Sequence, residues 1–202
     1  MAKVYEAIDD RVKKWISAQK VFFVATAPLS GGHINCSPKD GYSIRVLDPK
    51  TLVYLDLIGS GIETIAHLRE NGRIIVMMCA FEGAPMIMRF HGRGEIIEKD
   101  HPEFERFKPM FNAEIGIRSF VVIYLDRISD SCGFGVPVLE FKYHRKQLRT
   151  HCERNGEEKL NEYMLSHNHH SIDGLPGVAP KEAIMDATPR ISMVTTNSKN
   201  GL

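Results

Sequence analysis

The chain has 202 residues, of which 43% are hydrophobic and 25% are charged, a composition typical of a soluble globular protein with one buried core. Its 26 basic and 25 acidic residues give a net charge of +1, so no overall field favours nucleic acid or an anionic membrane as a partner. No stretch approaches the roughly 20 apolar residues of a membrane span, and the charged amino terminus lacks a signal-peptide core. The four cysteines lie far apart, which favours reduced thiols and a cytoplasmic location.

The first predicted elements are a helix and two pairs of strands. Apolar residues at helical spacing predict an amphipathic helix over residues 5–19. The β-branched and aromatic run 21–27 predicts a strand, which returns through a Ser-Gly-Gly turn into a second arm at 33–37. Residues 43–47 and 51–57 predict a second strand pair.

The next predicted elements are again mostly strands. Short turns join them, which indicates an antiparallel sheet that closes on itself, in a mainly β fold with peripheral helices. The nearly continuous apolar run 73–81 predicts a central strand that is buried on both faces. The other elements are a helix at 62–71 that Gly72 ends, a long strand at 86–98 with a bend at Gly92 and Gly94, a short helix at 102–108, and a strand at 119–127.

The carboxyl-terminal quarter has a different character. Two polar segments, 145–154 and 157–165, predict helices, and a Thr-, Asn- and Ser-rich stretch closes the chain. We therefore expect a barrel over residues 1–143, a helical extension packed on it over 144–190, and a flexible tail over 191–202.

A glycine turn between a predicted strand and a predicted helix is the first candidate site. Ser60 and Gly61 lie in this turn, and Thr64 lies in the first turn of the helix. Glycines let backbone N–H groups point at an anion, and the helix start adds partial positive charge. The turn thus favours phosphate binding, although the same residues also suit an ordinary helix cap.

Polar side chains also occupy strand positions where apolar ones are expected. In the segment Asn35-Cys36-Ser37-Pro38-Lys39, alternation places the first, third and fifth side chains on one face until the proline disturbs the register. Arg89 lies between a methionine and a phenylalanine, so it needs an anionic partner or an exit to solvent. Lys39 and Arg89, together with the glycine turn, suit a phosphate monoester. The alternative is that both are surface charges whose stems pack on apolar neighbours.

Other polar clusters are weaker candidates. Adjacent histidines at 167, 169 and 170 point in different directions and lack carboxylates at ligand spacing, so no metal site is predicted. No pair of acids has the arrangement of a hydrolytic dyad, and no catalytic residue is assigned.

Several blocks together resemble the pyridoxamine 5'-phosphate oxidase-like FMN-binding split β-barrels. The resemblance runs from about residue 11 to residue 127, and stretches 131–137 and 171–177 are similar to a poorly characterised subgroup of that family. The blocks are Val-Phe-Phe-Val-Ala-Thr-Ala at 21–27, Asn-Cys-Ser-Pro-Lys at 35–39, Leu-Val-Tyr-Leu-Asp at 52–56, Gly-Ser-Gly-Ile-Glu-Thr at 59–64, Asn-Gly-Arg-Ile at 71–74 and Arg-Phe-His-Gly-Arg-Gly at 89–94.

This resemblance implies a six-stranded antiparallel split barrel that forms a homodimer with FMN at the interface. Residues 35–39 would then lie along the flavin, the turn would hold its phosphate, and the arginine of the long strand would lie beside it. Where the authentic oxidase has an Arg/Lys pair in the turn, this chain has Gly61 and Ile62, and it lacks the arginine-rich final strand. Oxidation of pyridoxamine phosphate is therefore not expected. The predicted cofactor-binding residues are Asn35, Cys36, Ser37, Pro38, Lys39, Ser60, Gly61, Thr64 and Arg89.

The function predicted from these features is an FMN-dependent oxidoreductase that transfers hydride to or from a small molecule. One alternative is a barrel that binds flavin, haem or another cofactor without turnover, with His33, His67 or His91 as the haem ligand. A barrel without a ligand is another alternative, and the sequence does not separate FMN from a deazaflavin.

Overall fold

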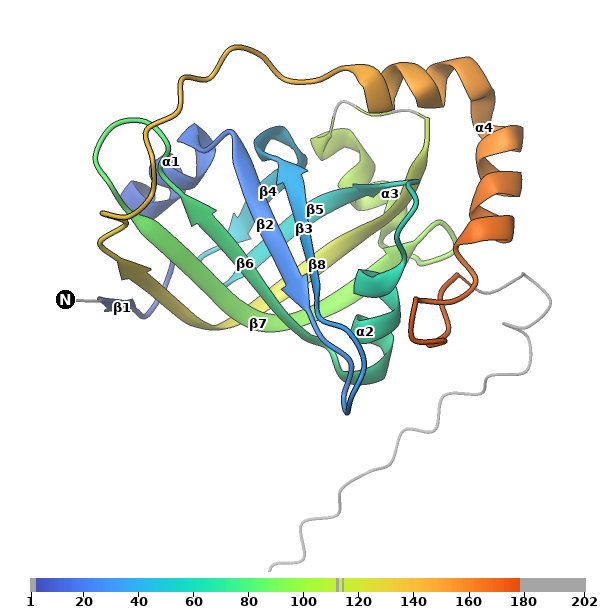
Figure 1. The fold of residues 1–202 in the computed structure, drawn as a ribbon, viewed down its shortest axis with the longest axis horizontal. Coiled ribbons are helices and arrows are strands. Elements are labelled where there is room, and N and C mark those ends of the chain that lie inside the picture. Colours follow the sequence, from blue (N-terminus) through green and yellow to red (C-terminus); the bar gives the residue numbers. More distant parts are fainter. Residues whose placement is uncertain (1–2, 112, 114, 179–202) are drawn as a thin grey trace, which may run out of the picture.

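One curled antiparallel sheet of eight strands dominates the computed structural model, which describes residues 3–111, 113 and 115–178 (Figure 1). The strands are β1 (Val4–Tyr5), β2 (Val21–Thr26), β3 (Asn35–Asp40), β4 (Ile44–Asp48), β5 (Thr51–Leu57), β6 (Arg73–Cys79), β7 (Ile87–Glu98) and β8 (Ile117–Ser131). The described helices are α1 (Asp10–Ala18), α2 (Glu63–Asn71), α3 (Phe104–Phe107) and α4 (Gln147–His167), with 3-10 turns η1 (Gly41–Ser43) and η2 (Lys108–Met110).

The strand order makes the sheet an open, or split, barrel. The order is β3-β2-β6-β7-β8-β5-β4, and the two-residue β1 pairs with β8. The end strands β3 and β4 follow each other in the chain through η1, but no ladder joins them in the described residues. The predicted mainly β split barrel is confirmed, and its described sheet has eight strands where the resemblance implied six.

Alternating side chains of the strands fill the barrel. Phe22, Tyr54 and Phe90 come from three different strands and are completely buried in one apolar cluster. Val12 and Ile16 of α1 join the same cluster, because the helix presents its apolar face to the barrel. This cluster joins α1 to β2 and to strands β4–β8 inside the barrel.

A second apolar cluster covers the outer face of β5 and β8. Phe104, Phe107 and Phe111 pack against Phe120, with ring centroids 5.1–5.9 Å apart. β5 is consequently buried on both faces over most of its length. The prediction of two buried faces for residues 73–81 is only half right, since β6 alternates between buried and less buried positions.

Short local contacts explain where the predicted element boundaries shift. The first helix begins at Asp10 and not at residue 5, because Val4–Tyr5 pairs with β8 and the Asp9 carboxylate accepts a hydrogen bond from the Val12 N–H, 2.7 Å away. Gly72 ends α2 in the left-handed conformation, as predicted. The two predicted carboxyl-terminal helices form α4, which is interrupted at Gly156 with φ 70°.

The bend predicted at Gly92 is present as a register shift between β7 and β8. A Cβ atom at this glycine would lie 2.1 Å from the carbonyl oxygen of Tyr124, so only glycine permits the close approach of the two strands.

The segment after β8 runs along one side of the sheet to α4, and the chain then returns toward α2 (Figure 1). Cys152 and Leu160 of α4 are buried against Ile58, and Val178 packs on Ile62 and Ile65. The described part of the predicted extension thus contacts the turn before α2. Residues 179–190 of the extension and the predicted tail 191–202 lie outside the described residues. No helix in the described ranges is both long and apolar enough to cross a membrane.

Candidate functional site

A cavity of about 400 Å³ opens at the split, between β3, the end of β5 and the turn before α2. Seven of the nine predicted cofactor-binding residues line it, whereas Cys36 and Arg89 do not. The seven are Asn35, Ser37, Pro38, Lys39, Ser60, Gly61 and Thr64.

Strand alternation explains which side chains of β3 face the cavity. Asn35, Ser37 and Lys39 are half-buried, whereas Cys36 and Pro38 are exposed. The proline does not shift the register, because it pairs directly with Phe23 in an unbroken ladder. β3 is an edge strand, where a missing N–H is tolerated on the unpaired side. The predicted common face of the three polar side chains is thus present, and the predicted disturbance at Pro38 is not.

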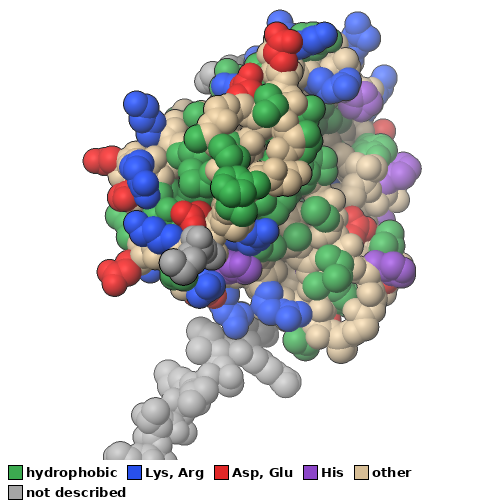
Figure 2. All heavy atoms as spheres, turned by 60° about the vertical axis from the view of Figure 1, so that its left-hand side comes forward, with side chains coloured by type: hydrophobic (Ala, Val, Ile, Leu, Met, Phe, Trp, Pro, Cys, Tyr) green, Lys and Arg blue, Asp and Glu red, His purple; other side chains and the backbone are tan. Residues whose placement is uncertain are grey.

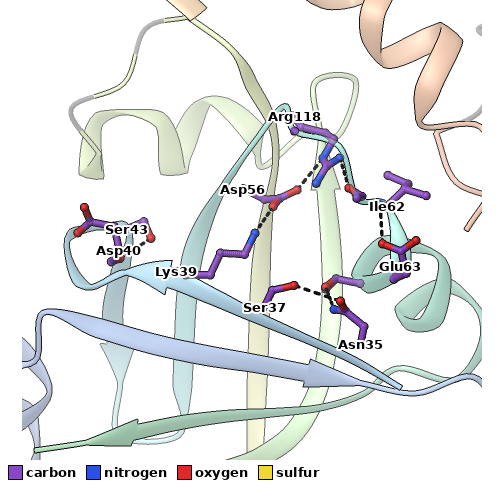
Figure 3. A network of polar contacts seen from close by, with 12 residues as sticks. Asn35, Ser37, Lys39, Asp40, Ser43, Asp56, Ile62, Glu63 and Arg118 are labelled. Atoms are coloured by element: carbon purple, nitrogen blue, oxygen red, sulfur yellow. Dashed lines mark hydrogen bonds and ion pairs between the residues drawn. The ribbon is translucent and has the colours of Figure 1, made fainter. Parts of the chain in front are cut away.

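A buried carboxylate with two cations forms the centre of the site. The Lys39 Nζ atom lies 2.9 Å from Asp56 Oδ1, and Arg118 Nε lies 2.7 Å from Asp56 Oδ2. Figure 3 shows the two cations approaching the carboxylate from opposite sides. Asp56 and Arg118 are almost completely buried, while the lysine side chain is 24% exposed. The three groups together carry one net positive charge beside the cavity.

A local irregularity of the sheet brings Arg118 to this position. Asp56 pairs with Ser119 and Leu57 pairs with Ile117, so the arginine is an extra residue between two paired positions of β8. Such bulges redirect a side chain from the regular alternation of a strand. The guanidinium therefore reaches the carboxylate from β8, the neighbour of β5.

The carboxyl-terminal extension holds Arg118 from the other side. Arg118 Nη1 donates to the Gly61 carbonyl oxygen at 2.6 Å and to Asn168 Oδ1 at 3.0 Å. Asn168 is completely buried, and its Nδ2 atom donates to the Gly59 carbonyl oxygen at 3.1 Å. The glycine turn, β8 and the extension are consequently joined through one arginine.

The charges around Asp56 determine its protonation. Burial by itself would raise the pKa of this carboxyl, but the nearby Lys39 and Arg118 cations outweigh burial and lower the pKa from its ordinary value of 3.8 to about 2. The carboxylate therefore stays ionised at any physiological pH.

The lowered pKa predicts a loss of stability in acid. Because the folded pKa is below the unfolded one, the ionised carboxylate stabilises the fold above about pH 4, and this contribution disappears as the pH falls through 2. We expect about 2 kcal/mol of unfolding free energy to be lost progressively between about pH 5 and pH 1. Urea unfolding of wild type and Asp56→Asn at a series of pH values measures it, since the variant should show a shallower acid slope. If the unfolding free energy falls with the same slope in acid in both proteins, the loss does not come from Asp56.

One backbone N–H of the glycine turn already donates a hydrogen bond to a carboxylate at the start of α2. The Glu63 carboxylate accepts a hydrogen bond from the Ile62 N–H at 3.0 Å and another from the Ile172 N–H at 3.3 Å. One of the turn amides predicted to hold a phosphate thus already has an anionic partner. The Ser60 side chain is exposed on the cavity side of this turn.

Hydroxyl and amide groups complete the polar wall of the cavity. Asn35 Nδ2 donates to Thr64 Oγ1 at 3.0 Å, and Ser37 Oγ donates to Asn35 Oδ1 at 3.1 Å. This arrangement leaves the threonine hydroxyl proton and one amide proton of the asparagine available to a ligand. The Tyr54 hydroxyl is buried beneath this wall without a hydrogen-bond partner among the described residues.

Arg89 lies on a different face of the sheet. Its neighbours Met88 and Phe90 point into the barrel core, so its own side chain points outward. Its Nη1 atom donates to Ser131 Oγ at 3.0 Å. The side chain thus leaves the core, which was one of the two possibilities for this arginine, and it does not line the cavity in which the phosphate was predicted.

The three histidines considered as haem ligands do not meet at the cavity. His67 is completely buried and its Nδ1 atom lies 2.9 Å from Thr26 Oγ1, while burial lowers its pKa. His33 is exposed beside Asp173, and His91 lies in β7. No group of three or more potential metal ligands occurs in the described ranges.

Sequence reasoning missed three residues of the site, Asp56, Arg118 and Asn168. The aspartate ends a strand and the asparagine follows a polar helix, so both resemble ordinary loop residues in the sequence. An arginine just before the apolar run 120–123 was the only sequence signal, because such a position in a buried strand requires a counter-ion.

Known proteins similar to this chain share most of its length. The family model described as pyridoxamine 5'-phosphate oxidase matches residues 8–132. The pyridoxamine 5'-phosphate oxidase family protein ustO of Aspergillus flavus is 38% identical over 191 residues, which cover 86% of this chain and 77% of ustO.

Solved structures are similar to a part of this chain at lower identity. HupZ from Group A Streptococcus is 25% identical, with a TM-score of 0.47, and the match covers 60% of this chain and 91% of that chain. A protein from Syntrophomonas wolfei described as FMN-binding is 15% identical, with a TM-score of 0.47, and the match covers 63% of this chain and 85% of that chain. On the family match over residues 8–132 and the identity to ustO, the chain belongs to the pyridoxamine 5'-phosphate oxidase family.

Proposed function

We propose that the protein is a cytoplasmic, homodimeric flavoprotein that binds FMN at the split of the barrel and transfers hydride to or from a small organic substrate. The observation that carries this proposal is the net positive cluster of Lys39, Asp56 and Arg118 beside the polar cavity. Membership of the pyridoxamine 5'-phosphate oxidase family, for which the sequence resemblance implied FMN, supports it.

The residues of the cavity fit a phosphate monoester. Lys39 offers the most accessible positive charge, and Arg118 adds a second cation from behind Asp56. The Thr64 hydroxyl and the Asn35 amide each keep a proton to donate to phosphate oxygens. Charge-assisted hydrogen bonds of this kind are stronger than neutral ones. Asp56 holds both cations in place and prevents the cluster from carrying two unbalanced charges without a ligand.

A bound flavin would supply the hydride chemistry. The chain contributes binding and orientation: the phosphate end is held by the cluster, and β3 provides a rigid wall beside it. Hydride transfer itself requires no pair of carboxylic acids. The two carboxylates that line the cavity, Asp40 and Glu63, already accept hydrogen bonds from the Tyr42 and Ile62 N–H groups.

Exposed hydrophobic side chains support the proposed homodimer. Figure 2 shows hydrophobic side chains gathered over part of one face of the molecule, with lysine and arginine side chains around them. Contiguous apolar surface of this kind marks interaction sites. Large apolar side chains that are more than half exposed include Leu29, Ile34, Tyr42, Tyr124, Phe134, Val138 and Tyr143.

Titration of the purified full-length protein with FMN and with riboflavin tests the proposal. FMN should bind about 10–150 times more tightly than riboflavin, because only FMN carries the phosphate. Equal affinities would show that the cluster does not bind the phosphate. Failure to take up either flavin, or a Soret band in the purified protein, would overturn FMN as the cofactor.

Two further experiments test the rest of the proposal. Bleaching of the bound flavin by NADH or NADPH without oxygen tests the oxidoreductase activity. Sizing chromatography tests the dimer.

Removal of the Glu63 charge should strengthen FMN binding. Its carboxylate lines the cavity and occupies the Ile62 N–H, so it repels an incoming phosphate. We expect Glu63→Gln to lower the Kd for FMN about fivefold, the factor for ~1 kcal/mol of repulsion, and to leave the Kd for riboflavin unchanged. Fluorescence titration measures both constants. Glu70→Gln, at an exposed position later in the same helix, is the matched control. A weaker affinity for FMN in the Glu63 variant would show that the phosphate lies elsewhere.

A further inference from the structure

A second, mainly apolar groove of about 720 Å³ adjoins the cofactor cavity. Its floor is formed by side chains of β5, of the segment after η2 and of α4. Asp40, Ser43, Leu55, Leu57 and Leu148 line both spaces, so the groove continues from the cavity without a break. The volume is within the range of small-molecule sites.

Basic side chains surround this apolar floor. The Arg45 guanidinium lies over the ring of Phe111, with its Cζ atom 4.9 Å from the ring centroid, and its Nη1 atom donates to two backbone carbonyl oxygens. Three further cations, Arg145, Lys146 and Arg149, come from the segment after β8. Two carboxylates face these four cations.

Both carboxylates already have partners. Glu153 Oε1 lies 2.9 Å from Arg149 Nε, and Asp40 lies 2.9 Å from His144 Nδ1. Arg145 and Lys146 make no ion pair or side-chain hydrogen bond within the described ranges, and both are exposed at the groove. The groove therefore keeps an excess of positive charge next to an apolar floor.

From this geometry we propose that the groove binds the substrate, and that the substrate is a small organic anion with a carboxylate or phosphate group on an aromatic or aliphatic body. The apolar floor receives the body, and Arg145 and Lys146 bind the anionic group. The identification of the ligand as a substrate rests on the proposed flavin site, because the shared lining places the two ligands side by side. Its anionic class follows from the charges of the groove alone.

Three of the four basic residues of the groove come from outside the part of the chain that the family model matches. Arg145, Lys146 and Arg149 all lie beyond residues 8–132, which the family model matches. The carboxyl-terminal segment thus adds a charged wall, and Leu148 of α4, to a groove whose other apolar floor residues precede residue 116. Specificity for an anion is consequently a property of the added segment.

Calorimetric titration with 2-naphthoate and with its neutral isostere 2-naphthamide tests the proposal. The full-length protein is used both loaded with FMN and without added flavin. In wild type, naphthoate should bind about tenfold more tightly than naphthamide. The double variant Arg145→Gln/Lys146→Gln should lose most of this difference while its FMN affinity stays within about twofold of wild type. The double variant Lys142→Gln/Lys159→Gln removes two exposed lysines that do not line the groove and is the matched control.

Three results would overturn the substrate class: equal binding of the two probes to wild type, equal losses in the test and control variants, or a change of oligomeric state in the test variant with unchanged naphthoate binding. The last result would assign the groove to contact between copies of the chain. Failure of FMN uptake together with intact discrimination between the probes would instead overturn the flavin proposal and support the anion site.

Discussion

Replacement of Asp56 by alanine is expected to lower the free energy of unfolding by about 3–5 kcal/mol, the cost of breaking a buried ion pair from one side. Lys39 can turn toward water because its side chain is 24% exposed, but the Arg118 side chain is only 6% exposed and has no such exit. The substitution therefore leaves a buried guanidinium whose remaining partners are a carbonyl oxygen and an amide. The unfolding free energy lost in Asp56→Ala is larger than that lost when Asp56 is protonated in acid, because alanine also leaves a cavity.

Urea unfolding followed by circular dichroism measures the change, with Asp126→Ala as the matched control. Asp126 lies in β8, the neighbour of β5, and is exposed, so its replacement should change stability by less than about 0.5 kcal/mol. The double variant Asp56→Leu/Arg118→Met should recover much of the stability, because apolar residues of similar volume remove both desolvated charges. A loss below about 1 kcal/mol in Asp56→Ala would show that Arg118 is well solvated without its carboxylate.

The strands were predictable because runs of apolar and β-branched residues end at turn residues. Predicted and observed bounds agree fully for β5 and within two residues for β6 and β7. β1 was missed, since a two-residue strand has no detectable period, and its pairing with β8 spans more than 120 residues of sequence. The start of α1 was misplaced for the same reason, because residues 4–5 satisfy their backbone groups in the sheet.

The site was predictable where its residues act through local geometry. Alternation alone put Asn35, Ser37 and Lys39 on one face, and the turn before α2 was recognisable from its glycines. The positions of Arg89 and Arg118 were not predictable in this way. The face of a strand residue depends on register, and one extra residue in β8 brings Arg118 to the cavity while regular alternation points Arg89 outward.

Lys39→Met should raise the Kd for FMN about 10–150-fold, which corresponds to a loss of 1.5–3 kcal/mol for a hydrogen bond to a charged group. The substitution removes the more accessible of the two cations and reduces the net charge of the cluster from +1 to zero. Asp56 keeps its ion pair with Arg118, 2.7 Å away, so the variant should remain folded. Flavin fluorescence titration at several salt concentrations measures the effect, and the affinity of the variant should depend less on salt.

The matched control is Arg89→Met, which removes a half-buried cation from the outer face of the same sheet. Its side chain donates to Ser131 and does not line the cavity, so the variant should bind FMN like wild type. The pair of variants separates the two possible origins of flavin affinity. If the overall charge of the barrel attracts FMN, both variants lose affinity equally. If the cluster at the split binds the phosphate, only Lys39→Met does. A larger loss in Arg89→Met would place the phosphate on the outer face and would remove the cavity as the cofactor site.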